Sequence, residues 1–253
     1  MSDAEVFGNF DKDRNAMFVE GINTVLKIWE SEPPYDIKGD YWDISVKKTM
    51  APEIGQGFIM KPFQKPHPLI VGTAVAPFSK GVTEMAKRGW QPISAPFLLP
   101  EWVKTHWPKY VEGREAVGAV AHPDEWRVAK SIFVADDEAT AKRYALQEGG
   151  PYHFYFKQLV RKLVGGGGRG NLFKLDQNMP DSEITIDYVT KRLVLAGTVD
   201  SVVDQILAFR EVIGDFGQLL YACHDWMDPK LARRSMELFA TEVMPRVNAA
   251  IKS

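Results

Sequence analysis

Cysteine is almost absent from the sequence, and long apolar runs are absent altogether. The single residue Cys223 excludes a disulfide bond within the chain. No apolar run approaches the roughly 18 residues that span a bilayer, and the first residues lack the basic and apolar regions of a signal peptide. We therefore expect a cytoplasmic protein that has no membrane partner.

An excess of either charge is also missing. The chain has 31 Lys and Arg residues against 33 Asp and Glu residues, a formal net charge of -2, and the two signs are interspersed. This balance predicts that neither nucleic acid nor an anionic membrane is a partner. With 253 residues, 45% of them hydrophobic, the chain is long enough to bury a sizeable core as one large domain or as two small ones.

Signatures of phosphate and metal sites are scarce. The turn at residues 72–79 contains neither G-x-G-x-x-G nor G-x-x-x-x-G-K-[ST]. The four glycines at residues 165–168 are not followed by Lys-Ser or Lys-Thr, so they indicate a mobile lid or a surface loop and not a P-loop. The five histidines are scattered without the spacing of metal ligands, and no metal site is predicted.

What the sequence does contain is a series of strand-like segments, each followed by helical sequence. Apolar or alternating runs occur at residues 69–74, 90–94, 126–134 and 216–222. This order predicts an α/β fold with parallel β/α units. A closed (β/α)₈ barrel has eight strands in about 250 residues, so these four strands indicate the second half of such a barrel.

Helices are predicted from apolar spacing and from capping residues. They are expected at residues 13–29 with Asp11 or Asp13 as cap, from Pro100 to about Gly118, after Asp136 or Asp137, from Pro151, from Thr198 to Phe209, and at residues 229–247. Residues 36–45 are typical of a short hairpin or a covering loop. Residues 185–195 fit either a helix or a strand.

The segment at residues 62–90 is the main candidate site. Its buried strand ends in the small residues Gly72, Thr73 and Ala74, and Ser79 is placed to cap a helix that stops at Gly89. Such a unit offers free N–H groups and the positive end of a helix dipole, which bind phosphate in α/β proteins. The alternative is that it is one more β/α unit without a ligand, and both interpretations stay open.

Other polar residues carry weaker signals. His106 shares a helix face with Trp102 and Tyr110 and has no acidic partner one turn away, which favours a packed or surface histidine. Cys223, His224 and Asp225 are adjacent, and neighbours in a strand point to opposite faces. Adjacency alone therefore does not make them a catalytic pair. The turn at residues 197–200 either holds an anion or only caps the next helix.

A set of short motifs extends along almost the whole chain in a fixed order. They are residues 2–8, 14–29 and 39–42, the prolines with Gln64 and His67 at residues 62–68, Ser79, residues 86–89 and 133–136, Gly197-Thr198, and residues 216–220. In their order and spacing these motifs resemble the bacterial luciferase-like flavin-dependent monooxygenases, especially the limonene monooxygenase-like branch. The resemblance covers the C-terminal half of that family's TIM barrel, strands 5 to 8, and it implies a single domain over residues 1–253.

The resemblance implies a cofactor and an activity. It places the phosphate of FMN on the loop after the fifth barrel strand, with Gly72, Thr73, Ala76 and Ser79 as cofactor-binding residues. The FMN is used in its reduced form, is supplied by a separate flavin reductase, and reacts with O₂ to oxygenate a small organic substrate. A deazaflavin is the alternative cofactor.

The resemblance also implies what this chain lacks. The family's first four β/α units have no counterpart here, so no catalytic residue is assigned. A non-catalytic flavin- or phosphate-binding module, or an inactive fragment of such an enzyme, is therefore the alternative function. Unpaired strand edges favour a homo-oligomer or a partner that supplies the missing half.

Overall fold

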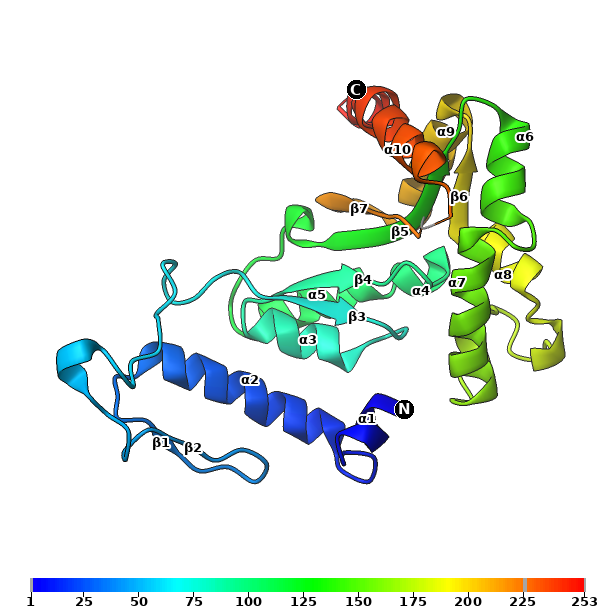
Figure 1. Ribbon diagram of the computed structural model, residues 1–253. Helices are drawn as coiled ribbons and strands as arrows, with labels where there is room; N and C mark the ends of the chain where they lie inside the picture. The colour runs from blue at the N-terminus through cyan, green and yellow to red at the C-terminus, as the bar shows by residue number, and fades with distance from the viewer. Residues whose placement is uncertain (1, 225–226, 253) are drawn as a thin grey trace. The chain divides into compact units, whose positions relative to one another are not determined.

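The computed structural model describes residues 2–224 and 227–252. The chain forms two compact units, Met1–Leu69 and Ile70–Ser253, and each is described by itself (Figure 1). The single domain expected over residues 1–253 stays a prediction. Within the described residues, no helix is both long enough and apolar enough to span a membrane.

The first unit is built on one long helix and a small hairpin. Its elements are α1 (Ser2–Val6), α2 (Arg14–Glu30), β1 (Asp36–Ile37), β2 (Ile44–Ser45) and the 3₁₀ turn η1 (Pro52–Ile54). The predicted cap is confirmed, because the Asp13 carboxylate accepts hydrogen bonds from the N–H groups of Asn15 and Ala16 at 3.0 Å each. The predicted hairpin is confirmed by the antiparallel pairing of β1 with β2.

The second unit contains a five-stranded parallel sheet. Its strands are β3 (Val71–Ala74), β4 (Gln91–Ser94), β5 (Arg127–Val134), β6 (Val194–Gly197) and β7 (Gln218–Ala222). The order is β3, β4, β5, and both β6 and β7 pair with β5. In the part of the chain that the structure describes, no pairing joins β3 to β7, so the sheet stays open. The parallel α/β architecture is confirmed.

The four predicted strands are all present, and β6 is an addition. The undecided segment at residues 185–195 is mostly helix, α8 (Ile186–Leu193), and runs without a turn into β6. Because β7 pairs with residues 127–131 of β5 and β6 pairs with residues 131–134, the long strand β5 lies at the centre of the sheet. All of its residues except Arg127 are buried.

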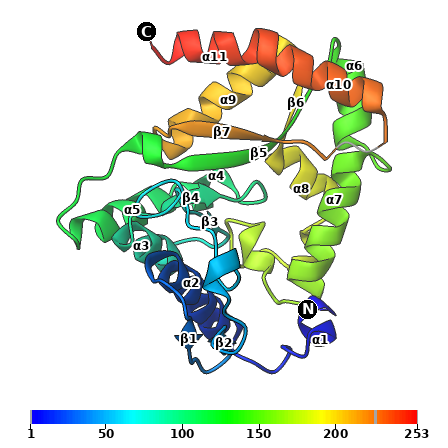
Figure 2. The same cartoon turned by 60° about the vertical axis from the view of Figure 1, so that its left-hand side comes forward.

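Helices pack along this sheet (Figure 2). They are α3 (Lys80–Lys87), α4 (Pro100–Val103), α5 (His106–Glu115), α6 (Glu138–Ala141), α7 (Pro151–Val160), α8, α9 (Val199–Ile213), α10 (Pro229–Leu238) and α11 (Met244–Ala250). The π-helical segments η3 (Lys142–Leu146), η4 (Arg161–Gly165) and η7 (Phe239–Val243) continue α6, α7 and α10, and short 3₁₀ turns lie at η2 (Pro123–Glu125), η5 (Gly170–Leu172) and η6 (Asp181–Glu183).

The single helix predicted from Pro100 to Gly118 is wrong in one respect. It is two helices, α4 and α5, which are separated at Lys104 and Thr105. The Thr105 hydroxyl donates a hydrogen bond to the Trp102 carbonyl at 2.6 Å, and such side-chain bonds compete with the helix ladder. The break gives α5 its own starting point, next to the ends of β3 and β4.

Helices α3 and α5 pack very closely on the same side of β3 and β4 (Figures 1 and 2). A Cβ atom on Gly113 of α5 would lie only 2.3 Å from the Thr83 carbonyl oxygen and 2.6 Å from the Ala86 Cβ of α3. The Thr83 hydroxyl also donates to the Lys109 carbonyl at 3.1 Å. The glycine and this bond fix α5 against α3, and through α3 against the loop that follows β3.

Candidate functional site

The loop after β3, residues 75–79, has an unusual backbone. Phe78 has a φ of 51°, in the left-handed region that residues with a side chain rarely adopt. Such a conformation costs about 1 kcal/mol or more and persists only where the surroundings hold it. Here the Phe78 N–H donates to the Thr105 hydroxyl at 2.8 Å, and the phenyl ring meets Trp102 edge-on with centroids 6.5 Å apart.

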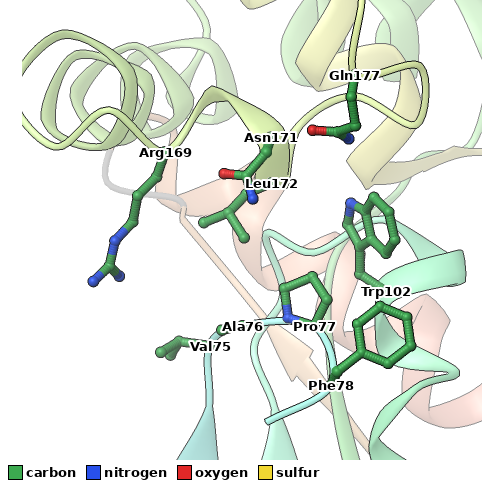
Figure 3. A pocket seen from close by; sticks show the side chains of 9 residues that line it. All are labelled: Val75, Ala76, Pro77, Phe78, Trp102, Arg169, Asn171, Leu172 and Gln177. Carbon is green, nitrogen blue, oxygen red and sulfur yellow. The ribbon is translucent and has the colours of Figure 1, made fainter.

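This loop forms one wall of a cavity of about 570 Å³ (Figure 3). The lining residues are Val75, Ala76, Pro77, Phe78, Trp102, Arg169, Asn171, Leu172 and Gln177. The volume lies within the usual range of small-molecule sites, roughly 300–1,000 Å³. The predicted surface loop at residues 165–168 is exposed, and the chain after it supplies Arg169 and Asn171 to the cavity wall.

Trp102 brings an unsatisfied donor to this cavity. Its indole Nε1–H is buried and has no hydrogen-bond acceptor among the residues described. Figure 3 shows the indole below Gln177, with its nitrogen-bearing edge turned toward the segment that carries Asn171 and Gln177. A buried donor without a partner costs about 1–3 kcal/mol. A ligand with an acceptor atom in this cavity would remove that cost.

The N-terminus of α3 lies directly after the loop. Ser79 occupies the N-cap position, as predicted, but its side chain makes no capping hydrogen bond, so the expected capping role of its hydroxyl is wrong. The first N–H groups of a helix have no acceptor within the helix. At Gly81 a Cβ atom would lie 3.3 Å from the Ser79 Oγ. The missing side chain at Gly81 therefore leaves space beside the Ser79 hydroxyl at the start of α3.

The four predicted cofactor residues are distributed over the strand and the loop. Ala76 lines the cavity and Ser79 stands at the start of α3. Gly72 faces α3 instead, because a Cβ atom there would lie 2.1 Å from the Met85 Sδ. Thr73 is exposed on β3. Cofactor contact stays a prediction for all four residues, and sequence reasoning did not find Trp102 or Arg169.

Of the two predicted alternatives, a packed or a surface histidine, His106 is the packed one, and both of its ring nitrogens are bonded. Nδ1 lies 2.8 Å from the Ser94 Oγ, and Nε2 lies 2.9 Å from the Ala76 carbonyl oxygen. The Trp126 Nε1–H donates to the same Ser94 Oγ at 2.9 Å. Burial lowers the pKa of His106 although the bond to Ala76 opposes the shift, so the ring is neutral at pH 7.

A second histidine, His224, lies just after β7. Its Nε2 is 2.9 Å from the Ser131 Oγ of β5, and its ring stacks on Tyr155 with centroids 3.8 Å apart. Burial lowers the pKa of His224 to about 4. Its polar partner thus comes from β5 and not from its neighbour Cys223. Cys223 and His224 lie beyond the end of β7, so the alternation expected along a strand does not apply to them, and Asp225 lies outside the described residues.

His224 also lines a second cavity of about 450 Å³. Phe154 and Lys157 of α7 line the same cavity, together with Glu148, which precedes α7, and Met227, which follows His224.

The turn at residues 197–198, which was a second candidate anion site, already holds a carboxylate. The Glu138 Oε1 accepts from the N–H and the hydroxyl of Thr198 at 3.0 and 3.1 Å, and this occupancy disfavours the anion-binding alternative for that turn.

Comparisons with known proteins identify the family of this chain. A family model described as luciferase-like monooxygenase matches residues 2–215. The chain is 26% identical to 3,6-diketocamphane 1,6-monooxygenase from Pseudomonas putida, over 95% of this chain and 64% of that protein. It is 23% identical to 4-hydroxyprotoasukamycin monooxygenase from Streptomyces nodosus subsp. asukaensis, over 99% of this chain and 63% of that protein.

Solved structures agree. The oxygenating constituent of 3,6-diketocamphane monooxygenase from the CAM plasmid of Pseudomonas putida, a type II Baeyer-Villiger monooxygenase in complex with FMN, matches with a TM-score of 0.78 and 25% identity, over 97% of this chain and 68% of that one. An F420-dependent secondary alcohol dehydrogenase shares the fold, with a TM-score of 0.59 and 19% identity, over 90% and 60% of the two chains. The chain spans less than two thirds of the length of both curated relatives. It belongs to the luciferase-like monooxygenase family.

Proposed function

We propose that this chain is part or all of a flavin-dependent monooxygenase that uses reduced FMN and O₂ to oxygenate a small organic substrate. The observation that carries the proposal is the cavity between residues 75–78 and the 169–177 segment, which lies beside the open N-terminus of α3. Family membership supports the reaction class. FMN is favoured over a deazaflavin because the structural relative at 25% identity holds FMN.

The residues present fit a cofactor that carries a phosphate. The Ser79 hydroxyl and the first N–H groups of α3 would donate hydrogen bonds to the phosphate, and the helix dipole would favour its negative charge. Lys80 at the start of α3 and Arg169 on the cavity wall would add positive charge. Ala76 and Thr73 would lie along the cofactor's tail, and Gly72 would act through its packing with Met85.

The cavity itself would bind and shield the reactive part of the cofactor. Trp102 would donate its free indole N–H to an acceptor atom, while Phe78 and Leu172 provide apolar walls that exclude water. When bound, reduced flavin supplies the electrons with which O₂ is activated. The residues of this chain bind it, orient it and exclude water.

Partners follow from the same proposal. Reduced FMN would be delivered by a separate flavin reductase, and the second partner is a small organic substrate. The open edges of β3 and β7, each paired on one side only in the described sheet, favour a homo-oligomer or a partner that completes the barrel. If those edges stay open, the alternative is a module that binds FMN without turnover.

A titration with FMN tests the site. We expect the Ser79→Ala variant to bind FMN about tenfold more weakly than the parent chain, since a hydrogen bond to a charged group contributes about 1.5–3 kcal/mol. Quenching of flavin fluorescence measures the affinity. Ser45→Ala is the matched control, because Ser45 is exposed in the hairpin of the first unit.

Turnover is then measured with a flavin reductase, NADH and O₂ by substrate consumption. Oxygenated product supports the monooxygenase, whereas FMN binding without product supports the binding module. Equal affinity of Ser79→Ala and the parent chain would reject the phosphate site. A parent chain that binds no FMN even at millimolar concentration would reject both functions for this chain.

A further inference from the structure

Two consecutive residues at the break between α4 and α5 hold the loop after β3 on both sides of Pro77. The His106 Nε2 lies 2.9 Å from the carbonyl oxygen of Ala76, before Pro77. The Thr105 hydroxyl accepts a hydrogen bond at 2.8 Å from the N–H of Phe78, after Pro77. Both bonds reach the main chain, so they set the backbone path of the loop irrespective of its side chains.

The hydrogen-bond directions are fixed by the chemistry of the end groups. A carbonyl oxygen only accepts, so His106 carries its proton on Nε2 and donates it to Ala76. Nδ1 of the neutral ring is then an acceptor, and the Ser94 hydroxyl donates to it. The Ser94 Oγ in turn accepts from the indole N–H of Trp126. Each donor in this hydrogen-bond network has one acceptor only if the neutral His106 ring carries its proton on Nε2, so the network selects that tautomer.

The loop needs such support because of Phe78. A phenylalanine at a φ of 51° does not hold that conformation by itself. Of the two supporting residues, His106 is the first residue of α5 and Thr105 immediately precedes it, and α5 is fixed against α3 at Gly113. The loop, its two supports and the anion-binding start of α3 therefore form one connected structure.

We propose that Thr105 and His106 are positioning residues that preorganise residues 75–78 for ligand binding, with the neutral His106 Nε2–H as the essential donor. The proposal rests on the proposed FMN site, because FMN is the ligand for which the loop is shaped. Neither residue lines the cavity. Each acts through the backbone of Ala76 or Phe78, and a preorganised loop binds more tightly because less ordering is left to the binding step.

Two substitutions of His106 separate this role from a general packing role. In His106→Gln the side-chain amide nitrogen reaches the position of Nε2 and keeps the donor to Ala76. In His106→Asn the shorter amide reaches only the position of Nδ1 and keeps the contact with Ser94. We expect His106→Asn to bind FMN about five- to tenfold more weakly than the parent chain, the effect of one hydrogen bond. His106→Gln should recover most of that loss.

The ligand-free protein supplies an independent readout. Amide hydrogen exchange at residues 75–80 should be faster in His106→Asn than in His106→Gln, and ¹⁵N NMR of the parent imidazole should show the proton on Nε2. If the parent chain binds no FMN but this exchange difference is found, the proposed cofactor is wrong and the positioning role stands. Equal exchange and equal FMN affinity in the two variants, or a proton on Nδ1, would overturn the positioning role.

Thr105→Val provides the second test if His106→Asn fails to fold. The valine keeps the shape of the side chain and removes both the acceptor of the Phe78 N–H and the donor to the Trp102 carbonyl. We expect faster exchange of the Phe78 amide, because its acceptor is lost, and an FMN affinity at least about fivefold lower. Thr105→Ser retains the hydroxyl and should restore both values. No difference between the valine and serine variants would contradict the role of Thr105.

Discussion

Two places in the second unit bury a hydrogen-bond donor that has no acceptor among the described residues, and their surroundings differ completely. Trp102 lines the cavity beside residues 75–78, and its Nε1–H is buried within that wall. The Lys130 Nζ lies inside the packed layer between β5 and α9, 5.0 Å from the centre of the Phe209 ring. Lys130 is only 1% exposed and is not among the residues that line the cavity.

The difference shows how a protein can accommodate an unsatisfied donor. An indole N–H does not titrate near neutral pH, so Trp102 keeps its donor and offers it to whatever enters the cavity. An amine can lose its charge, and burial lowers the pKa of Lys130 to about 8, although the carboxylate of Glu101 opposes that shift. The first donor belongs to the wall of the proposed cofactor site. The second reduces stability at neutral pH.

The largest expected effect comes from replacing the lysine. Below pH 8 both the folded and the unfolded chain bind this proton, and the folded chain bears the cost of the buried charge. A depression of the pKa from 10.5 to about 8 corresponds to a cost on the order of 3 kcal/mol at pH 7. Lys130→Met should raise the free energy of unfolding by about that amount, as measured by urea denaturation.

The pH dependence of the unfolding free energy provides a second test of the buried lysine. Between pH 8 and 10.5 the unfolded chain holds a proton that the folded chain has released, so the stability of the parent chain should rise with pH. Lys130→Met should lack this part of the rise. Lys174→Met is the matched control, because Lys174 is also buried but is bonded to Asp181 at 2.8 Å. It should destabilise, and a stabilised Lys174→Met would contradict the argument.

The next effect concerns the indole. Trp102→Phe should weaken FMN binding about five- to tenfold, the effect of one hydrogen bond. It should change the unfolding free energy of the ligand-free chain by less than about 1 kcal/mol, because the removal of an unsatisfied donor offsets the lost apolar contact. Fluorescence titration and urea denaturation measure the two quantities.

Trp126 is the control for this substitution. Its indole N–H is bonded to the Ser94 Oγ at 2.9 Å, so Trp126→Phe leaves a buried hydroxyl with one partner fewer. It should destabilise the chain by about 1–2 kcal/mol. If Trp102→Phe destabilises the ligand-free chain as much as Trp126→Phe does, then the Trp102 donor already has a partner and its role in binding is refuted.

The smallest expected effect comes from replacing Glu101, the carboxylate that acts on Lys130. Glu101 is exposed and its carboxylate raises the pKa of Lys130. Glu101→Gln should therefore lower that pKa further and start the rise of stability with pH at a lower value. The loss of stability at pH 7 should stay below about 1 kcal/mol, since the carboxylate is solvated. Glu115→Gln on α5 should leave the curve unchanged, and an equal shift in both variants would point to a nonspecific charge effect.

The sequence predicted those parts of the fold whose signal is local. The strand at residues 126–134 alternates and is bounded by turn residues, and it is observed as β5. β6 was missed because α8 runs into it without a turn, so helical and strand spacing merge. The break at Thr105 depends on a side-chain bond to Trp102, which no apolar periodicity reveals.

The sequence also predicted only one part of the candidate site, the part with a local signal. Small residues after a strand and a serine before a helix identified the loop at residues 72–79. The other wall of the cavity, with Arg169 and Gln177, comes from chain about 90 residues further along, and only the tertiary fold brings it there. The helix face of His106 predicted a packed or surface histidine and did not decide between the two, and its bond to Ala76 connects residues 30 positions apart.

The tight contact at Gly113 has a mechanical consequence. Since no methyl group fits between α5 and the Thr83 carbonyl of α3, we expect the two helices to move together as one rigid pair, with the proposed anion site at the start of α3. A displacement of α3 on binding would be transmitted to the exposed residue Glu115 at the far end of α5. A fluorescent label attached at that position would convert the arrival of a cofactor into an optical signal without touching the cavity.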